Sequence, residues 1–302
     1  MLDPVRVARA IATNQIARFA PSVYLQMTAQ TGRGDSSTES AVEIAQYFKA
    51  SVADYLARVG LSPVDAPGYF GGKTIIEYGP GDFPGVAVLL AAYGAAKVYC
   101  VDRFAMVNLG EKNLQVLEAL AKDLDEPARS RLAELRTGAV GGQQPFAPDK
   151  IEYVVKPSGL SGLRKQADLV ISRAVLEHVD DLQRTFEDML HAMRPGATAL
   201  HLVDLKSHGL HTRNALDFLE CAPWLWSLMY SHKGVPNRWR INRYRDIVAA
   251  LHVTHVEFEV TTRTDPSLAD EVRPRLSYAF RDVSSADLQC LGFWLRFDKK
   301  RE

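Results

Sequence analysis

The sequence predicts an α/β fold with a seven-stranded, mostly parallel sheet, helices on both of its faces and an antiparallel last strand. A short apolar strand, Thr74–Ile76, runs into Glu77 and a turn with glycines at Gly79, Gly81 and Gly85. A helix of small residues follows this turn. Further strand-like and helix-like segments then alternate along the chain, which is typical of parallel sheets whose strands are joined by helices.

Composition limits the partners and the compartment that we expect. The chain has 302 residues, 47% of them hydrophobic, which is enough for one large domain with a cap. The number of Lys and Arg residues equals the number of Asp and Glu residues, at 36 each. A protein whose main partner is nucleic acid requires a surplus of basic residues, so nucleic acid is not expected as the main partner. The three scattered cysteines suit a reducing cytoplasm, and no apolar run is long enough to span a membrane. We therefore expect a cytoplasmic protein without nucleic-acid or membrane partners. The oligomeric state is not indicated.

Residues 1–70 precede the first strand, and we expect them to form an N-terminal helical cap. Apolar residues at helical spacing predict helices over Pro4–Phe19 and Ser40–Val59. The simplest interpretation is that these helices cover the sheet. Tyr24 or Tyr47 closing over a ligand is the alternative.

The glycine-rich turn and the strand after it predict the kind of ligand. The second strand, Lys97–Val101, ends in Asp102, which is placed to accept hydrogen bonds from both hydroxyls of a ribose. The dinucleotide fingerprint is broken, because Gly79–Gly85 is one residue too long and Asp82 would repel a pyrophosphate. Glu77 before the glycines suits a cationic ligand instead. S-adenosylmethionine carries a sulfonium, an ammonium and a ribose but no phosphate. A nicotinamide-dependent oxidoreductase is the less favoured alternative.

The remaining elements follow in an order that continues the sheet. Apolar and alternating patterns predict the third to seventh strands over Ile151–Val155 (or Leu132–Thr137), Asp168–Ser172, Thr198–Leu205, Thr254–Thr262 and Leu288–Phe297. Helical spacing predicts helices over Met106–Lys122, Pro127–Leu135, Asp181–Met193 and Asn242–Leu251.

Taken together, these motifs resemble the class I S-adenosylmethionine-dependent methyltransferases, most closely a bacterial small-molecule type. Glu77–Gly81 looks like the first motif of that family and Asp102 looks like its ribose acid. Asp168–Val179, which ends in Leu-Glu-His-Val, looks like its fourth strand and the segment after it. Arg194–Gly196 is similar to the turn before its fifth strand. The resemblance covers roughly residues 40–300 and implies a Rossmann-like sheet that binds S-adenosylmethionine.

The resemblance also implies which residues bind the cofactor. Glu77 would hold the methionine ammonium, and Asp102 would bind the ribose. Backbone around Ser172–Ala174 would face the methionine portion, and the loop with Ser158 would meet the adenine. The expected cofactor-binding residues are Glu77, Tyr78, Gly79, Pro80, Gly81, Asp102, Arg103, Ser158, Ser172, Arg173 and Ala174.

Catalysis requires few groups, because methyl transfer from a sulfonium is an in-line displacement with a neutral leaving group. A base is needed only for a hydroxyl or a protonated amine, and His208 and then His178 are the candidates. The alternative for His178 is packing behind the cofactor, and Glu177 is interpreted as a structural acid. Asp204, His208 and His211 could meet around a divalent ion. Hydrogen-bonding roles are the simpler interpretation, so no metal is expected.

Within a methyltransferase domain over 71–302, residues 206–245 are predicted to form a lid over the acceptor. The lid is rich in aromatic residues, most of which would form its own core, while Arg238 or Arg240 best fits an acceptor contact. The sequence thus predicts O- or N-methylation of a small molecule, such as a saccharide or a natural-product intermediate. A degenerate methyltransferase fold that acts as a binding subunit is the alternative.

Overall fold

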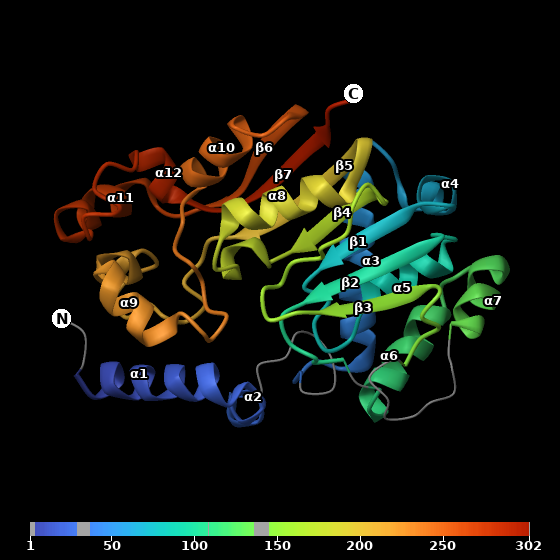
Figure 1. Cartoon of the computed structure of the whole chain (residues 1–302), viewed down its shortest axis with the longest axis horizontal. Coiled ribbons are helices and arrows are strands. Elements are labelled where there is room, and N and C mark those ends of the chain that lie inside the picture. The colour runs from blue at the N-terminus through green and yellow to red at the C-terminus, as the bar shows by residue number, and fades with distance from the viewer. Residues whose placement is uncertain (1–3, 29–36, 108, 136–144, 302) are drawn as a thin grey trace.

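The computed structural model describes residues 4–28, 37–107, 109–135 and 145–301. One seven-stranded sheet forms its centre, in the order β3-β2-β1-β4-β5-β7-β6 (Figure 1). Among the described strands, β7 runs in the direction opposite to the other six. The predicted mostly parallel, seven-stranded sheet with an antiparallel last strand is therefore confirmed. The strands are β1 (Thr74–Tyr78), β2 (Lys97–Asp102), β3 (Ile151–Val155), β4 (Ala167–Arg173), β5 (Met193–Asp204), β6 (Val253–Arg263) and β7 (Cys290–Lys299).

Helices cover both faces of the sheet (Figure 1). Successive residues of β1 point to opposite faces, so Ile75 and Ile76 belong to two different hydrophobic cores. The Ile75 core is shared with α3 (Ala41–Ala57), α4 (Ala66–Phe70), α5 (Gly85–Ala92), α6 (Glu111–Ala121) and α7 (Glu126–Glu134). The Ile76 core is shared with α8 (Leu182–Ala192) and α10 (Ile241–Ala249).

Polar residues define where several of these helices begin. At the start of α3, the Ser40 hydroxyl accepts from the Glu43 N–H, and the Glu43 carboxylate accepts from the Ser40 N–H at 2.8 Å. This reciprocal pair satisfies two backbone donors that the helix itself leaves unpaired. Asp181 caps α8 by accepting from the Arg184 N–H at 3.0 Å.

Gly85 sits where α5 packs most tightly against α3. A Cβ atom at Gly85 would lie 2.2 Å from the ring of Phe48, closer than packed carbon atoms can approach. We expect Gly85→Ala to lower the free energy of unfolding by about 1–3 kcal/mol through overpacking. Urea denaturation measures this change. Gly68→Ala in α4, where a Cβ meets no atom within 4 Å, is the control and should leave stability unchanged or slightly raised. Equal effects of the two substitutions would contradict the packing argument.

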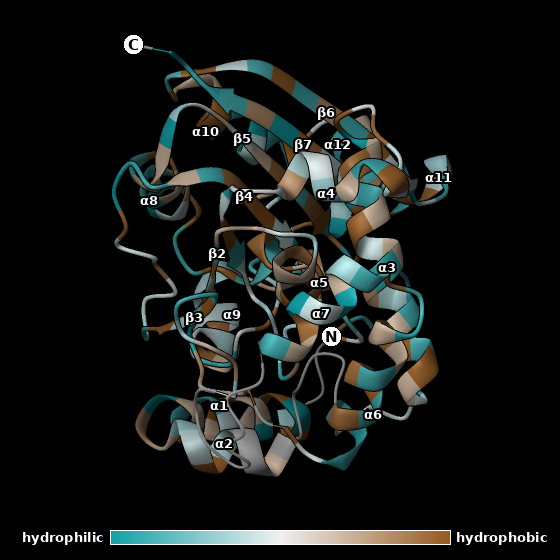
Figure 2. Ribbon diagram, turned by 90° about the vertical axis from the view of Figure 1, so that its right-hand side faces the viewer, coloured by the Kyte–Doolittle hydropathy of each residue, from teal (hydrophilic) through white to brown (hydrophobic). Residues whose placement is uncertain are grey.

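A third hydrophobic cluster is separate from the two cores on the faces of the sheet, although it includes Leu291 of β7, and we call it the lid core. It joins three segments that are distant in sequence and buries Ala10, Trp226 and Phe280 together. Figures 1 and 2 show α1 and α2 at one end of the molecule, beside α9 and away from α3. Its helices are α1 (Pro4–Phe19), η3 (Asp217–Glu220), α9 (Pro223–Tyr230), α11 (Pro266–Val272) and α12 (Ser285–Gln289). Helix α2 (Pro21–Thr28) follows α1, and η4 (Arg273–Arg275) follows α11.

The structure differs from the sequence-based expectation in several places. The N-terminal 70 residues do not pack as one unit, because α1 joins the lid core whereas α3 packs on the sheet. A second insertion, 264–289 between β6 and β7, completes the lid core and was not predicted. Helix α6 begins at Glu111 rather than at Met106. The predicted turn Arg194–Gly196 is an irregular bulge inside β5, since pairing with β4 jumps from Met193 to Thr198.

Candidate functional site

A cavity of about 290 Å³ opens at the carboxyl ends of β1, β2 and β4. The chain leaves β1 toward β2 on one side, while β4 lies on the other, so this is the point where the strand order reverses. Ligands of open α/β sheets bind at such a switch point. The lid contributes Lys233 and Gly234 to the cavity wall, and α2 contributes Tyr24.

The glycine-rich turn forms the part of the wall that follows β1. Tyr78, Gly79 and Gly81 line the cavity, whereas Pro80 between them is buried and does not. Gly79 has φ 67°, and a Cβ there would lie 2.3 Å from the side chain of Val175 after β4. Glycine is therefore required for the ends of β1 and β4 to approach each other.

Asp102 ends β2 and faces the same cavity. Its Oδ1 accepts from the N–H groups of Arg103 at 2.6 Å and Phe104 at 3.1 Å. Its Oδ2 accepts no hydrogen bond from the residues that the structure describes. Burial raises the pKa of Asp102 to about 6, against the opposing effect of the two backbone donors. One oxygen of a largely ionised carboxylate thus stays available to a ligand at neutral pH.

Glu77 lies one residue before the wall and does not border the cavity. Its side chain is buried, with only 7% exposed, and Oε2 makes no hydrogen bond to the described part of the chain. Burial raises the pKa of Glu77 to about 8. In the protein without ligand, the carboxyl is thus mostly protonated at neutral pH.

This raised pKa makes stability depend on pH in a defined direction. The pKa of Glu77 in the folded protein, about 8, lies above its ordinary value of 4.5. Its stabilising contribution is therefore complete below pH 4.5 and is lost as the pH rises toward 8. In that window we expect Glu77 to lower the unfolding free energy by up to about 1.4 kcal/mol per pH unit. Urea denaturation at a series of pH values should show that the free energy of unfolding falls more steeply with rising pH in wild type than in Glu77→Gln. Identical pH dependences of the two proteins would contradict the burial argument.

The wall beyond β2 and β3 contains Arg103 and Ser158, which were expected to bind the cofactor, and also Phe104, Met106 and Gly159, which were not named from the sequence. Arg103 is held by an ion pair with Asp180 at 2.9 Å. Phe104 and Met106 add apolar surface suited to a flat ring such as adenine. The sequence did contain a signal for Phe104 and Met106, because both apolar residues follow closely after Asp102, the candidate ribose acid.

Of the three residues predicted at the tip of β4, only Ala174 lines the cavity. The Ser172 hydroxyl is buried and bonds to Nδ1 of His201 at 2.8 Å, inside the sheet. Arg173 forms an ion pair with Asp54 of α3 at 2.9 Å. Ala174 has φ 53°, an uncommon conformation for a residue with a Cβ. Backbone at this tip therefore reaches the cavity, whereas the Ser172 and Arg173 side chains turn elsewhere.

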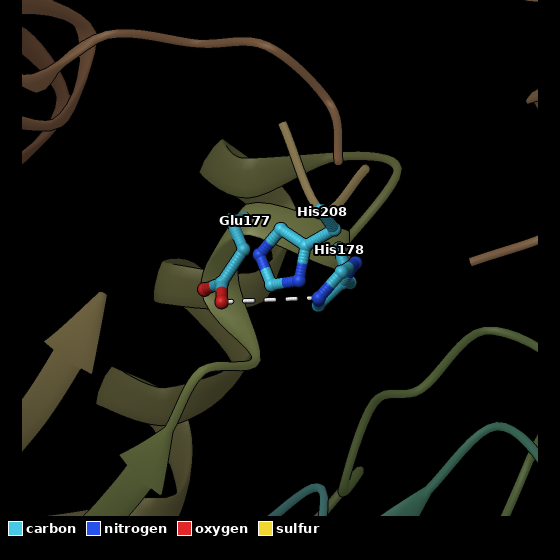
Figure 3. A group of neighbouring side chains, drawn as sticks. All are labelled: Glu177, His178 and His208. Carbon is cyan, nitrogen blue, oxygen red and sulfur yellow. Dashed lines mark ion pairs between the residues drawn. The ribbon is translucent and has the colours of Figure 1, made fainter. Parts of the chain in front are cut away.

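The two predicted catalytic histidines come together at the edge of the cavity (Figure 3). His178, at the end of η2 (Leu176–His178), lines the cavity, and the exposed His208 follows β5. Their ring centroids lie 4.9 Å apart with the planes at 69°. Burial, with a smaller effect of the neighbouring His208, lowers the pKa of His178 to about 4. His178 is therefore neutral at physiological pH and offers a nitrogen lone pair rather than a charge.

Glu177 lies beside this pair and is only 1% exposed. Its Oε1 is 3.8 Å from Nε2 of His178, and burial raises the pKa of Glu177 well above its usual range. By contrast, Asp204 and His211 bond within their own loop, to the Lys206 N–H and the Ser207 hydroxyl. The cluster that forms is thus Glu177, His178 and His208, not the loop set considered from the sequence.

The lid is fastened to this cluster and to α1. The Asn237 N–H donates to the Glu177 carbonyl at 2.6 Å, and its side-chain amide donates to the carbonyls of Leu176 and Val179. The Lys233 ammonium donates to the Ala10 carbonyl in α1 at 2.7 Å. These contacts hold the lid over the carboxyl end of β4, beside the two imidazoles.

Arg238 and Arg240 do not reach the cavity. Arg238 donates to the Cys221 carbonyl at 2.7 Å, and Arg240 donates to the Leu205 carbonyl at 2.9 Å. Both guanidinium groups are buried, so backbone carbonyls compensate for the water that they lose. They brace the lid rather than meet an acceptor.

Comparison with known proteins shows the family. Residues 45–256, which are most of the chain, match the family model described as a methyltransferase domain. The chain belongs to this methyltransferase family, and it is an S-adenosylmethionine-dependent methyltransferase. This confirms the predicted enzyme class and cofactor and removes the nicotinamide-dependent alternative. The bacterial small-molecule type with Leu-Glu-His-Val stays a prediction.

Solved methyltransferase structures resemble the chain at low sequence identity. A Mesorhizobium loti S-adenosylmethionine-dependent methyltransferase is 18% identical, with 76% of this chain and 92% of that chain covered and a TM-score of 0.43. A Haemonchus contortus phosphoethanolamine N-methyltransferase 2, bound to phosphomonomethylethanolamine and S-adenosylhomocysteine, is 16% identical with a TM-score of 0.42. The match covers 77% of this chain but only 49% of that one. The family match carries the assignment.

A third similar structure is a complex. It contains the Haloferax volcanii Trm112 methyltransferase activator and a methyltransferase, with 15% identity, coverage of 88% of this chain and 100% of that chain, and a TM-score of 0.41. Within the part of the present chain that the structure describes, every helix is too short or too polar to cross a bilayer.

Proposed function

We propose that this enzyme methylates an oxygen or nitrogen atom of a small molecule, and that the acceptor binds beside His178 and His208. The observation that carries the proposal is the pairing of these imidazoles, from two different strand ends, at the rim of the cavity. A saccharide or a natural-product intermediate with a hydroxyl or amine is the acceptor class that such groups suit.

The residues around the cavity fit the cofactor. Oδ2 of Asp102 accepts no hydrogen bond from the described residues and is placed for a ribose hydroxyl. The unpartnered Oε2 of Glu77 suits a nearby ammonium, reached directly or through water. Gly79 and Gly81 leave room for a ligand to lie against the backbone, and the wall presents no phosphate-binding loop. When bound, S-adenosylmethionine supplies an electrophilic methyl group on a sulfonium.

The remaining tasks fall to the protein itself. Tyr24, Lys233 and Gly234 cover the cavity, so they would exclude water and hold the acceptor in line for displacement. His178 and His208 are the proposed catalytic residues, because their imidazoles meet where His178 lines the cavity.

Formation of S-adenosylhomocysteine with a panel of acceptors tests this proposal. The panel should contain monosaccharides, phenols, catechols and primary amines, each incubated with the enzyme and S-adenosylmethionine. We expect turnover above the acceptor-free rate with at least one class, and mass spectrometry should locate the added methyl group on oxygen or nitrogen. Tight binding of S-adenosylhomocysteine without turnover across the panel would instead favour the binding-subunit alternative.

A further inference from the structure

Three side chains of types that can bind a metal, Glu177, His178 and His208, lie close together (Figure 3), and His178 among them lines the cavity. Glu177 and His178 come from η2, and His208 comes from the loop after β5. One ligand atom from each lies within 4.8 Å of the others, and the Glu177–His178 pair is 3.8 Å apart. The segments are far apart in sequence, so the fold rather than local spacing brings these atoms together.

The Glu177 carboxylate has weak partners for a buried acid, because burial outweighs the effect of the nearby N–H groups of Glu177 and Asp204 on its pKa. The residue is 1% exposed, and neither oxygen makes a hydrogen bond of normal geometry with the described residues. The 3.8 Å separation from His178 is also too long for a hydrogen bond. Burying unpaired polar groups is costly, and a bound cation would compensate for this cost.

The distances are compatible with a metal that draws the ligands together. Metal–ligand bonds of about 2.0–2.2 Å place neighbouring ligand atoms roughly 3–3.5 Å apart. Closing the present separations therefore requires movements of about 1 Å. His208 is exposed on a loop, so its imidazole has the freedom to move, while Asn237 holds the backbone on both sides of His178 through the carbonyls of Leu176, Glu177 and Val179.

We propose that Glu177, His178 and His208 form a binding site for a divalent transition-metal cation such as Zn²⁺ or Mn²⁺. Two imidazoles and one carboxylate favour these ions over Mg²⁺ and Ca²⁺, which prefer oxygen ligands. Three protein ligands leave positions open on the metal. Because His178 lines the cavity, the open positions would face the acceptor.

This site deepens the proposed function and rests on it for its catalytic role. The cation would hold the acceptor through oxygen, which assigns a hydroxyl rather than an amine as the methylated group. The hydroxyl would lose its proton to solvent, because the cation lowers the pKa of a bound hydroxyl. Its oxygen would then form the new bond to the methyl carbon as the carbon–sulfur bond breaks, with that electron pair remaining on sulfur. The products are a methyl ether and neutral S-adenosylhomocysteine.

Calorimetry with Zn²⁺ on chelator-treated full-length protein tests the site without any acceptor. We expect one Zn²⁺ per chain, with binding weakened by about 100-fold or more in His208→Ala and in Glu177→Gln. His208 is exposed and Glu177→Gln keeps the size of the buried side chain, so both variants should fold. His211→Ala, in the same loop but outside the cluster, is the matched control and should bind Zn²⁺ as wild type does. Substituting Co²⁺ should give visible absorption bands that His208→Ala lacks.

Titration of S-adenosylhomocysteine into the same metal-free samples separates this inference from the proposed function. Binding of S-adenosylhomocysteine together with Zn²⁺ binding that depends on His208 supports both. If S-adenosylhomocysteine binds but wild type and His208→Ala take up Zn²⁺ equally, the metal site is overturned while the methyltransferase function stands. If Zn²⁺ binds as expected but S-adenosylhomocysteine does not, the proposed role of the cavity fails and the metal site remains.

Discussion

Asp102→Ala should weaken the binding of S-adenosylhomocysteine by about 100-fold. The reason is that Oδ2 of Asp102 accepts no hydrogen bond from the described part of the chain and lies at the cavity wall, where we place the ribose hydroxyls. Hydrogen bonds to a charged group contribute roughly 1.5–3 kcal/mol each, and about 3 kcal/mol in total corresponds to about 100-fold in affinity. Isothermal titration calorimetry at pH 7.5 measures the change directly.

The fold should survive this substitution. Burial raises the pKa of Asp102 to about 6. The charge of this carboxylate therefore does not stabilise the folded protein at neutral pH. Asp102→Asn keeps an oxygen for the two backbone donors and serves as the milder variant. Asp149→Ala, in the exposed turn before β3, is the control and should bind as wild type does. An unchanged affinity in Asp102→Ala would remove Asp102 from the cofactor site.

His208→Ala should lower kcat by about 100-fold to 10⁴-fold while the affinity for S-adenosylhomocysteine stays within a few-fold of wild type. His208 contacts His178 but does not line the cavity in which we place the cofactor, so its loss should affect the acceptor step alone. Because the side chain is exposed, the melting temperature should not change. Single-turnover kinetics with an active acceptor measures the chemical step.

His252→Ala is the matched control for this variant. His252 is also exposed but lies before β6, away from the cavity, so kcat should not change. A loss of cofactor affinity equal to the loss of kcat would place His208 in the cofactor site instead. An undiminished kcat would leave His178 as the remaining histidine at the acceptor.

The central sheet could be predicted because its signals are local. The strand, turn and helix around Thr74–Ala92 carry apolar runs and glycines whose meaning does not depend on distant residues. The same holds for β3, whose observed bounds Ile151–Val155 coincide with the predicted ones. The position of Asp102 at the end of β2 followed from that pattern too.

The lid core could not be predicted, because it is assembled from three segments that are remote in sequence. Nothing local in 264–289 shows that it packs against α1 and α9. The same limitation explains the arginines, since the carbonyls that bind Arg238 come from Phe218 and Cys221, around the end of η3. Sequence patterns show which residues are polar but not which of them already have partners.

Only part of the candidate site could be predicted, for a similar reason. Both histidines were identified from their positions after β4 and β5, but their contact with Glu177 depends on how those strand ends are joined. Ser172 was assigned to the cofactor from its place at the tip of β4, whereas its hydroxyl faces His201 inside the sheet. One residue along a strand reverses the direction of a side chain, so tip residues are hard to orient from sequence.

Calorimetric titration of S-adenosylhomocysteine, with NAD as the comparison ligand, tests the central claim most directly. We predict that S-adenosylhomocysteine binds at one site per chain and that NAD gives no heat of binding. Thermal denaturation of the same samples should show that S-adenosylhomocysteine raises the melting temperature, because the ligand binds the folded protein only. The site would have been assigned wrongly if NAD bound and S-adenosylhomocysteine did not, or if Asp102→Ala bound S-adenosylhomocysteine as tightly as wild type does.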